Sequence, residues 1–117
     1  MLKVISLFMA LIPSIVMAEL LYPYLASARR AVTIKSQYIK VQEGDTENTV
    51  INILPDPDEA LDLYESKIYN PKIIGKTFWY IIQRKVKSGS AKERDEKLVR
   101  ISFNLQGKVI EVVHWGF

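Results

Sequence analysis

The side chains of this 117-residue chain that could support chemistry are few and scattered. The chain has one histidine, His114, and no cysteine. Thiol chemistry and cysteine-rich zinc sites are therefore excluded, and a Ser-His-Asp hydrolase would depend on His114 alone. His114 lies beside Trp115 in a predicted strand, which favours a structural histidine, although a role as a protonation switch stays open. The sequence predicts no catalytic residue, no metal site and no cofactor.

Four acidic residues gather near the middle of the chain, at positions Asp56, Asp58, Glu59 and Asp62. A calcium site needs six to eight oxygen ligands on a wrapped loop, and this cluster lacks the loop glycine of an EF-hand. Paired carboxylates for acid–base catalysis would need a cleft, which the sequence does not indicate. Helix capping and a solvated acidic first turn are the favoured interpretation.

The charge of the chain is balanced and mixed along its length. It has 16 basic and 13 acidic residues, for a net charge of +3. Nucleic-acid binders usually concentrate their positive charge, so no nucleic-acid partner is expected. The run from Lys92 to Lys97 mixes charges of both signs, which is typical of a solvated loop; a loop that contacts a partner is the alternative.

The first 18 residues resemble a secretory signal peptide. Lys3 is followed by an uncharged stretch from Val4 to Val16 and by a small residue, Ala18. We expect cleavage after Ala18 and a periplasmic or secreted protein. The alternative, an uncleaved anchor, would place Glu19 in the membrane at a cost of a few kcal/mol. The chain has no cysteine that could carry a lipid anchor.

The expected elements begin after an N-terminal extension, residues 19–38. Its first part is either a linker or a short helix, and residues 32–41 alternate in part, as in a strand or an extended segment. A helix is predicted from Asp45 or Thr46 until Pro55, because Val50, Ile53 and Leu54 recur at helical spacing. A second helix is predicted from its cap at Asp58 until Asn70-Pro71, with an apolar stripe that ends at Ile68, and it would complete a two-helix hairpin.

Beyond Gly75 the pattern favours strands. Residues 77–86, 98–104 and 108–115 are rich in aromatic and β-branched residues or alternate with period two. A polar loop, residues 87–96, and a turn at Gln106-Gly107 separate them. The predicted fold class is α+β, with the helical hairpin packed on a three-stranded antiparallel sheet, in a domain of residues 39–117.

Three consecutive aromatic residues form the main candidate binding feature. Neighbouring strand residues point to opposite faces, so Phe78 and Tyr80 share one side and Trp79 takes the other. The helices can cover one face only, which would leave a large aromatic open to a partner unless the N-terminal segment covers it. Arg84 and Arg100 add positive charge that could meet acidic protein or anionic lipid, or serve as ordinary surface charge. The candidate partner-binding residues are Phe78, Trp79, Tyr80, Arg84, Arg100 and Trp115.

Several of these segments, in this order, resemble the SmpA/OmlA (BamE-like) domain family over roughly residues 39–113. Gly44-Asp45-Thr46 and Val50, then Leu54-Pro55-Asp56-Pro57-Asp58, resemble its Gly-Met-Thr-x-x-x-Val … Leu-Gly-x-Pro-Asp signature. Phe78-Trp79-Tyr80 is similar to its aromatic strand, and Phe103-Asn104 to Val109 to its Phe-Asn/Asp-x-x-Gly-x-Val hairpin. Asp45 and Pro55 replace the family's methionine and glycine, and the acylated cysteine of its typical lipoproteins has no counterpart.

The resemblance implies a small envelope module that binds other proteins, with a fold similar to the β-lactamase-inhibitor proteins. We therefore expect a non-enzymatic protein-binding module, an accessory factor in outer-membrane assembly or envelope integrity. Its partners would be envelope proteins, with peripheral membrane contact as a further alternative. The rival hypothesis is a periplasmic or secreted inhibitor or immunity protein that blocks one specific enzyme.

Overall fold

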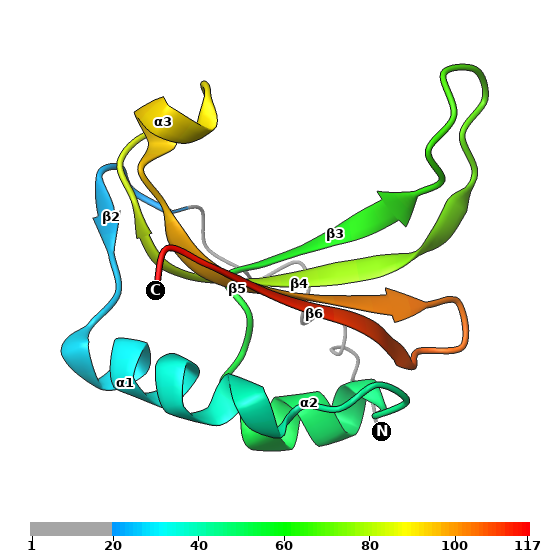
Figure 1. Cartoon of the computed structure of the whole chain (residues 1–117), viewed down its shortest axis with the longest axis horizontal. Coiled ribbons are helices and arrows are strands. Elements are labelled where there is room, and N and C mark those ends of the chain that lie inside the picture. Colours follow the sequence, from blue (N-terminus) through cyan, green and yellow to red (C-terminus); the bar gives the residue numbers. More distant parts are fainter. Residues whose placement is uncertain (1–19) are drawn as a thin grey trace, which may run out of the picture.

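A curled antiparallel sheet carries two helices on one side (Figure 1). The computed structural model describes residues 20–117, so the predicted signal peptide lies outside the described residues. The elements, in chain order, are β2 (Tyr24–Leu25), α1 (Ala28–Gln37), the 3-10 helix η2 (Tyr38–Lys40), α2 (Glu47–Ile53), β3 (Glu59–Tyr64), β4 (Ile73–Arg84), α3 (Ala91–Arg94), β5 (Lys97–Asn104) and β6 (Val109–Trp115).

The sheet has five strands, in place of the three predicted. Strand β4 is central, because β5 and then β6 follow on one of its edges while β2 and β3 share the other. Glu59 of β3 lies opposite Trp79, and Tyr24 of β2 lies opposite Arg84. All strand pairs are antiparallel. The three predicted strands correspond to β4, β5 and β6.

The predicted second helix is wrong, because residues 59–64 form strand β3. Leu61 and Leu63 alternate with Asp62 along this strand, and its backbone pairs with β4 from Trp79 to Ile73. The spacing of Leu61, Tyr64 and Ile68 fits a helix, but pairing with β4 satisfies the backbone instead. Asp58 therefore does not cap a helix.

Asp58 bridges the gap between β3 and β2 on the shared edge of β4. Its carboxylate accepts a hydrogen bond from the Ile81 N–H at 2.7 Å, and its own N–H donates to the Trp79 carbonyl at 2.8 Å. The same carboxylate lies 3.1 Å from the Arg30 guanidinium of α1 and accepts a hydrogen bond from the Tyr24 hydroxyl. One side chain thus joins three elements.

Helix α2 forms as predicted. The Thr46 hydroxyl accepts the Thr49 N–H at 3.2 Å, which caps the helix, and Gly44 supplies the positive φ of the preceding turn. Val50 and Leu54 are buried against the sheet.

Helix α1 replaces the strand or extended segment expected from residue 32. Ser27 caps it by accepting the Arg30 N–H at 3.1 Å. Ile34 is fully buried, with Ala31 and Tyr38 packed beside it, while Val32 is largely exposed. The spacing of the buried residues is that of a helix, and it places the segment before residue 39 on the same core as the rest of the chain.

The hydrophobic core lies between the two helices and one face of the sheet. Val99, Ile101 and Phe103 of β5 alternate toward it, as the sequence predicts. Its buried members are Ile34, Val41, Val50, Leu54, Phe78, Tyr80, Ile82, Val99, Ile101, Phe103 and Val109.

The substitution Asp58→Ala should lower the free energy of unfolding by about 3 kcal/mol. It leaves the Ile81 N–H without its acceptor and removes the carboxylate that pairs with Arg30. Urea unfolding followed by circular dichroism measures this loss. Asp62→Ala, on the exposed side of β3, is the matched control and should change stability by less than about 0.5 kcal/mol; equal effects of the two substitutions would contradict the assignment.

Candidate functional site

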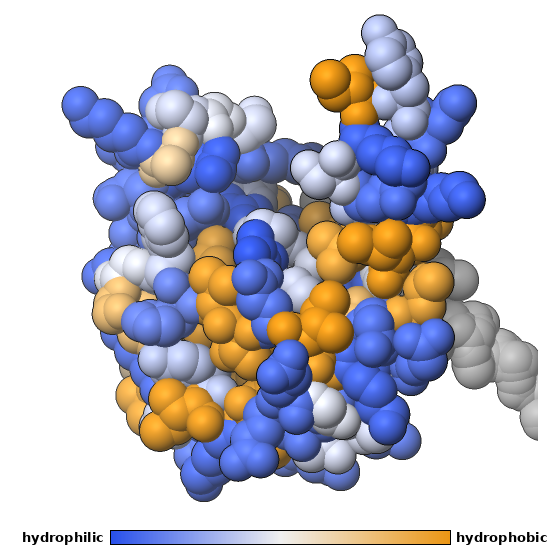
Figure 2. Space-filling model, turned by 45° about the vertical axis from the view of Figure 1, so that its right-hand side comes forward, coloured by the Kyte–Doolittle hydropathy of each residue, from blue (hydrophilic) through white to orange (hydrophobic). Residues whose placement is uncertain are grey.

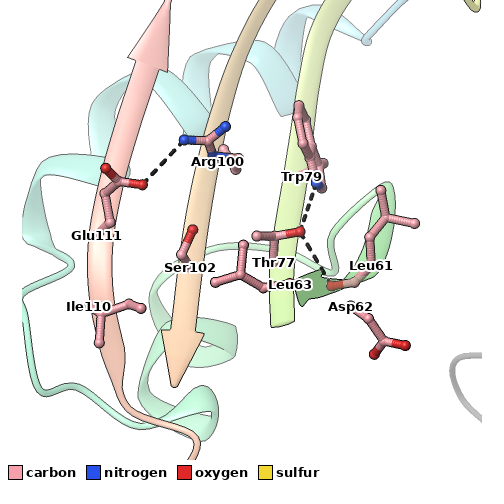
Figure 3. Close-up of a pocket in the computed structure, with 9 residues that line it drawn as sticks. All are labelled: Leu61, Asp62, Leu63, Thr77, Trp79, Arg100, Ser102, Ile110 and Glu111. Atoms are coloured by element: carbon pink, nitrogen blue, oxygen red, sulfur yellow. Dashed lines mark hydrogen bonds and ion pairs between the residues drawn. The ribbon is translucent and has the colours of Figure 1, made fainter. Parts of the chain in front are cut away.

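The face of the sheet opposite α1 and α2 carries no helix over its centre, and we call it the open face (Figure 1). Figure 2 shows the molecule hollowed between two raised ends. The raised ends belong to the β3–β4 hairpin and to the loop that contains α3 (Figure 1). A hollow of about 460 Å³ lies on this face. Its lining comes from four strands and is drawn in Figure 3: Leu61, Asp62, Leu63, Thr77, Trp79, Arg100, Ser102, Ile110 and Glu111.

Trp79 lies at the border of this hollow, and its ring is held in place by hydrogen bonds. The indole Nε1–H donates to the Thr77 hydroxyl at 2.9 Å, and that hydroxyl donates to the Leu61 carbonyl at 3.3 Å (Figure 3). A second hollow on the far side of Trp79 is lined in part by residues 87–89. The partly exposed ring therefore separates two depressions.

Two arginines flank the Trp79 ring. The guanidinium carbons of Arg84 and Arg100 lie 5.9 and 5.6 Å from its centroid, within the range of cation–π attraction. Arg100 reaches it from the neighbouring strand, where it is the register partner of Trp79. Arg84 reaches it because the pairing of β4 with β5 shifts between Ile81 and Gln83, which changes the alternation of side chains.

Both arginines are paired with carboxylates. Arg100 lies 3.2 Å from Glu111, whereas Arg84 is buried and lies 2.8 Å from Glu96 and 3.6 Å from Glu59. Burial lowers the pKa of Arg84, but its hydrogen bonds to Tyr22 and Glu96 and the nearby charges raise that pKa by more. The guanidinium therefore stays charged and ties β4 to the loop before β5.

The structure divides the six predicted binding residues between two faces. Trp79, Arg84 and Arg100 lie together on the open face. Trp115 is 56% exposed and pairs with Leu98, which in turn pairs with Ile81. Because Ile81 is two residues from Trp79 on β4, Trp115 lies on the same side of the sheet as Trp79. The prediction that Phe78 and Tyr80 bind a partner is wrong, because both lie on the opposite, covered face.

Phe78 and Tyr80 are buried in the core, where a partner could not contact them. Phe78 packs edge-to-face on Phe103, with ring centroids 4.8 Å apart. They share one side of β4, and the helices cover that side. The alternation predicted from the sequence is thus correct, and the location of the helices decides which aromatic is open.

Sequence reasoning missed the contribution of β3 and β6 to this face. The sequence pattern places Leu61 and Leu63 in a predicted helix. It does not mark Ile110 or Glu111 as binding residues. The alternation Leu61-Asp62-Leu63 was the available signal for β3, since period two is typical of a strand. The hollow depends on pairing between distant strands, which that local pattern does not specify.

The residue types of the open face are those found at protein interfaces. This face offers an aromatic ring, two charged planar groups and apolar side chains, which are typical anchors of interfaces. His114 lies on the other side of the sheet, where its ring is 5.2 Å from Tyr38 and its Nδ1 is 3.0 Å from the Phe117 carbonyl oxygen. Within residues 20–117, no group of three or more His, Cys, Asp or Glu residues could hold a metal ion.

Comparison with known proteins gives a structural likeness at low sequence identity. No family model matches the chain, and no curated protein matches it. A solved structure described as "osmotically inducible lipoprotein OsmE" is similar over 71% of this chain and 80% of its own, at 19% identity and a TM-score of 0.47. This degree of likeness carries no argument about function. In the part of the chain that the structure describes, no helix is long and apolar enough to cross a membrane.

The Tyr80→Phe variant should be more stable than the wild type by about 1 kcal/mol. The Tyr80 hydroxyl is fully buried and has no hydrogen-bond partner among the described residues, so its removal relieves a desolvation cost. Urea unfolding at neutral pH measures the difference, with Tyr64→Phe at an exposed site as the control. A loss of more than about 1 kcal/mol in Tyr80→Phe would show that the hydroxyl is satisfied in solution.

The wild type and the Tyr80→Phe variant should also differ in how their stability responds to alkaline pH. Burial raises the pKa of Tyr80 well above its ordinary value of 10.0. Because the unfolded chain then loses this proton first, the stability of the wild type falls as the pH rises above about 10. Tyr80→Phe should lose less stability than the wild type between neutral pH and that range.

Proposed function

We propose that this chain is a non-enzymatic protein-binding module of the bacterial envelope and that its open face contacts the partner. The observation that carries the proposal is the position of Trp79, fixed by Thr77 and flanked by Arg84 and Arg100 on a face without covering helices. Trp and Arg are the residue types that most often dominate binding energy.

The immobilised ring supports this function because binding is weakened when side chains must be ordered. An anchor already held by a hydrogen bond and by two cation–π contacts avoids part of that entropy cost, about 0.5–1.5 kcal/mol for a mobile side chain. The hollows on both sides of Trp79 give a partner two depressions to fill. Leu61, Leu63 and Ile110 add apolar surface there.

The envelope location rests on the sequence. The N-terminal segment resembles a signal peptide, and residues 39–113 resemble the SmpA/OmlA (BamE-like) family, whose members act around outer-membrane assembly or envelope integrity. We therefore propose an accessory role of this kind, in the periplasm or outside the cell. The absence of cysteine means that attachment through a lipidated cysteine does not apply to this sequence.

One observation favours a second candidate, an inhibitor or immunity protein. The β3–β4 hairpin extends beyond the rest of the sheet (Figure 1), and Ile68 and Tyr69 near its end are 91% and 83% exposed. A curved face bordered by a projecting loop is a suitable shape for contact with the entrance of an enzyme's active-site cleft. Tight one-to-one binding to a single hydrolase or toxin would favour this function over an assembly role.

The test of the proposed function is crosslinking in the native envelope, followed by identification of the attached protein. With that partner purified, Trp79→Ala should weaken binding by about 2 kcal/mol or more, roughly thirtyfold in Kd. Arg100→Gln should weaken it less, since its side chain is partly exposed and already paired.

Leu105→Ala is the matched control, because Leu105 is 68% exposed on the β5–β6 turn and does not line either hollow. It should bind as the wild type does. Urea unfolding of each variant shows that the fold is retained. If Trp79→Ala and Leu105→Ala bind equally well, the open face is not the contact surface.

A further inference from the structure

The end of the β3–β4 hairpin, residues 65–72, forms a projecting tip whose exposed groups match a lipid surface. We call it the β3–β4 tip. Ile68 is 91% exposed and Tyr69 is 83% exposed, which places two large apolar side chains side by side in the sequence at the most remote point of the hairpin. Figure 2 shows a hydrophobic group among hydrophilic ones on the prong where this tip lies.

The tip is held in shape by its own hydrogen bonds. The Glu65 N–H donates to the Lys72 carbonyl at 2.9 Å, and the Lys67 N–H donates to the Glu65 carbonyl at 2.9 Å. Asn70 has a positive φ of 48° just before Pro71, which turns the chain back. Ile68 and Tyr69 are therefore presented outward by an ordered loop.

The charged residues of the tip give it a small net positive charge. Glu65 is its only acidic residue. The Glu65 carboxylate accepts the Lys72 N–H at 3.2 Å and lies 3.3 Å from the Lys67 ammonium. The Glu65–Lys67 pair balances one charge of each sign, and Lys72 leaves the tip with a net charge of +1, while the Lys67 side chain is 62% exposed.

We propose that the β3–β4 tip inserts Ile68 and Tyr69 into the interface of a membrane that contains anionic lipid, with Lys67 and Lys72 at the headgroups. Tyrosine favours the membrane interface because its ring is apolar and its hydroxyl is polar, and lysine stems bury while their ammonium groups reach the phosphates. Basic residues near an anionic membrane surface are attracted to it.

The small area of the tip favours lipid over a protein partner that contacts the tip without the open face. A stable protein interface buries about 1,000 Å² or more with good complementarity. Eight residues at the end of a narrow hairpin present a convex point, which cannot supply that area alone. A bilayer interface deforms around such a point and needs no complementary pocket.

The experiment is sedimentation with vesicles of phosphatidylcholine and phosphatidylglycerol, compared with vesicles of phosphatidylcholine alone. The protein is expressed with its own N-terminal segment, so that any contribution of residues 1–18 is common to all variants. Wild type should bind the anionic vesicles, and binding should fall as salt is added. The double variant Ile68→Ser, Tyr69→Ser should bind at least about tenfold more weakly.

Two further variants separate the contributions. Lys67→Gln with Lys72→Gln should weaken binding to anionic vesicles about tenfold and remove most of its salt dependence. Leu105→Ser, at an apolar site that is 68% exposed on another hairpin, should bind as the wild type does. Trp79→Ala should also bind vesicles normally, so that this proposal and the proposed function fail independently.

Insertion itself is measured by tryptophan fluorescence. Ile68→Trp should show an emission shift to shorter wavelength with anionic vesicles, after subtraction of the wild-type signal of Trp79 and Trp115, whereas Leu105→Trp should not. The proposal is overturned if wild type does not bind anionic vesicles, or if the serine double variant binds as well as the wild type. It is also overturned if the tip variants lose only a crosslinked protein partner and keep vesicle binding.

Discussion

The architecture depends on how one edge of β4 is shared. This strand is longer than either partner on that edge, since β3 reaches Trp79 and β2 begins pairing at Gln83. The backbone between these points would be buried without partners, which is costly. Asp58 accepts the Ile81 N–H there, and Ala26 donates to the Ile82 carbonyl. Because Asp58 also pairs with Arg30, the contact that completes the sheet also fixes the helix layer.

This arrangement decides which side chains of β4 are available to a partner. With α1 and α2 fixed on one face, Phe78 and Tyr80 become core residues and Trp79 faces away from them. The shift in strand pairing after Ile81 then places Arg84 beside the Trp79 ring. The open face is therefore a consequence of the contacts that position the helices.

The parts of the fold that local chemistry controls were predictable from the sequence. Thr46 at a helix start, the turn at Gly107 and the aromatic and β-branched strands carry their own signals, and they lie where expected. Strand β3 carries two signals, helical spacing and alternation, and only its pairing with β4 decides between them. That pairing is nonlocal, so the local pattern from Asp58 to Asn70-Pro71 predicts a helix where β3 forms.

The candidate site was predictable in composition and not in arrangement. The sequence predicts that Trp79 is opposite in orientation to its aromatic neighbours, but it does not say where the helices lie. The burial of Arg84 was not foreseen either, because a one-residue shift in register leaves no clear mark in a run of β-branched residues.

The two arginines beside Trp79 differ in how far they are buried, and this difference indicates different roles. Arg84 is 7% exposed and its carboxylate partners come from β3 and the segment before β5, so it supports the ring from within the structure. The Arg100 side chain is 33% exposed and its carboxylate partner Glu111 lies at the hollow. A partner can displace or share the Arg100–Glu111 pair at little cost because that pair is already solvated. In the proposed function, contact with a partner would therefore fall on Trp79 and Arg100, whereas Arg84 supports the Trp79 ring from within the structure.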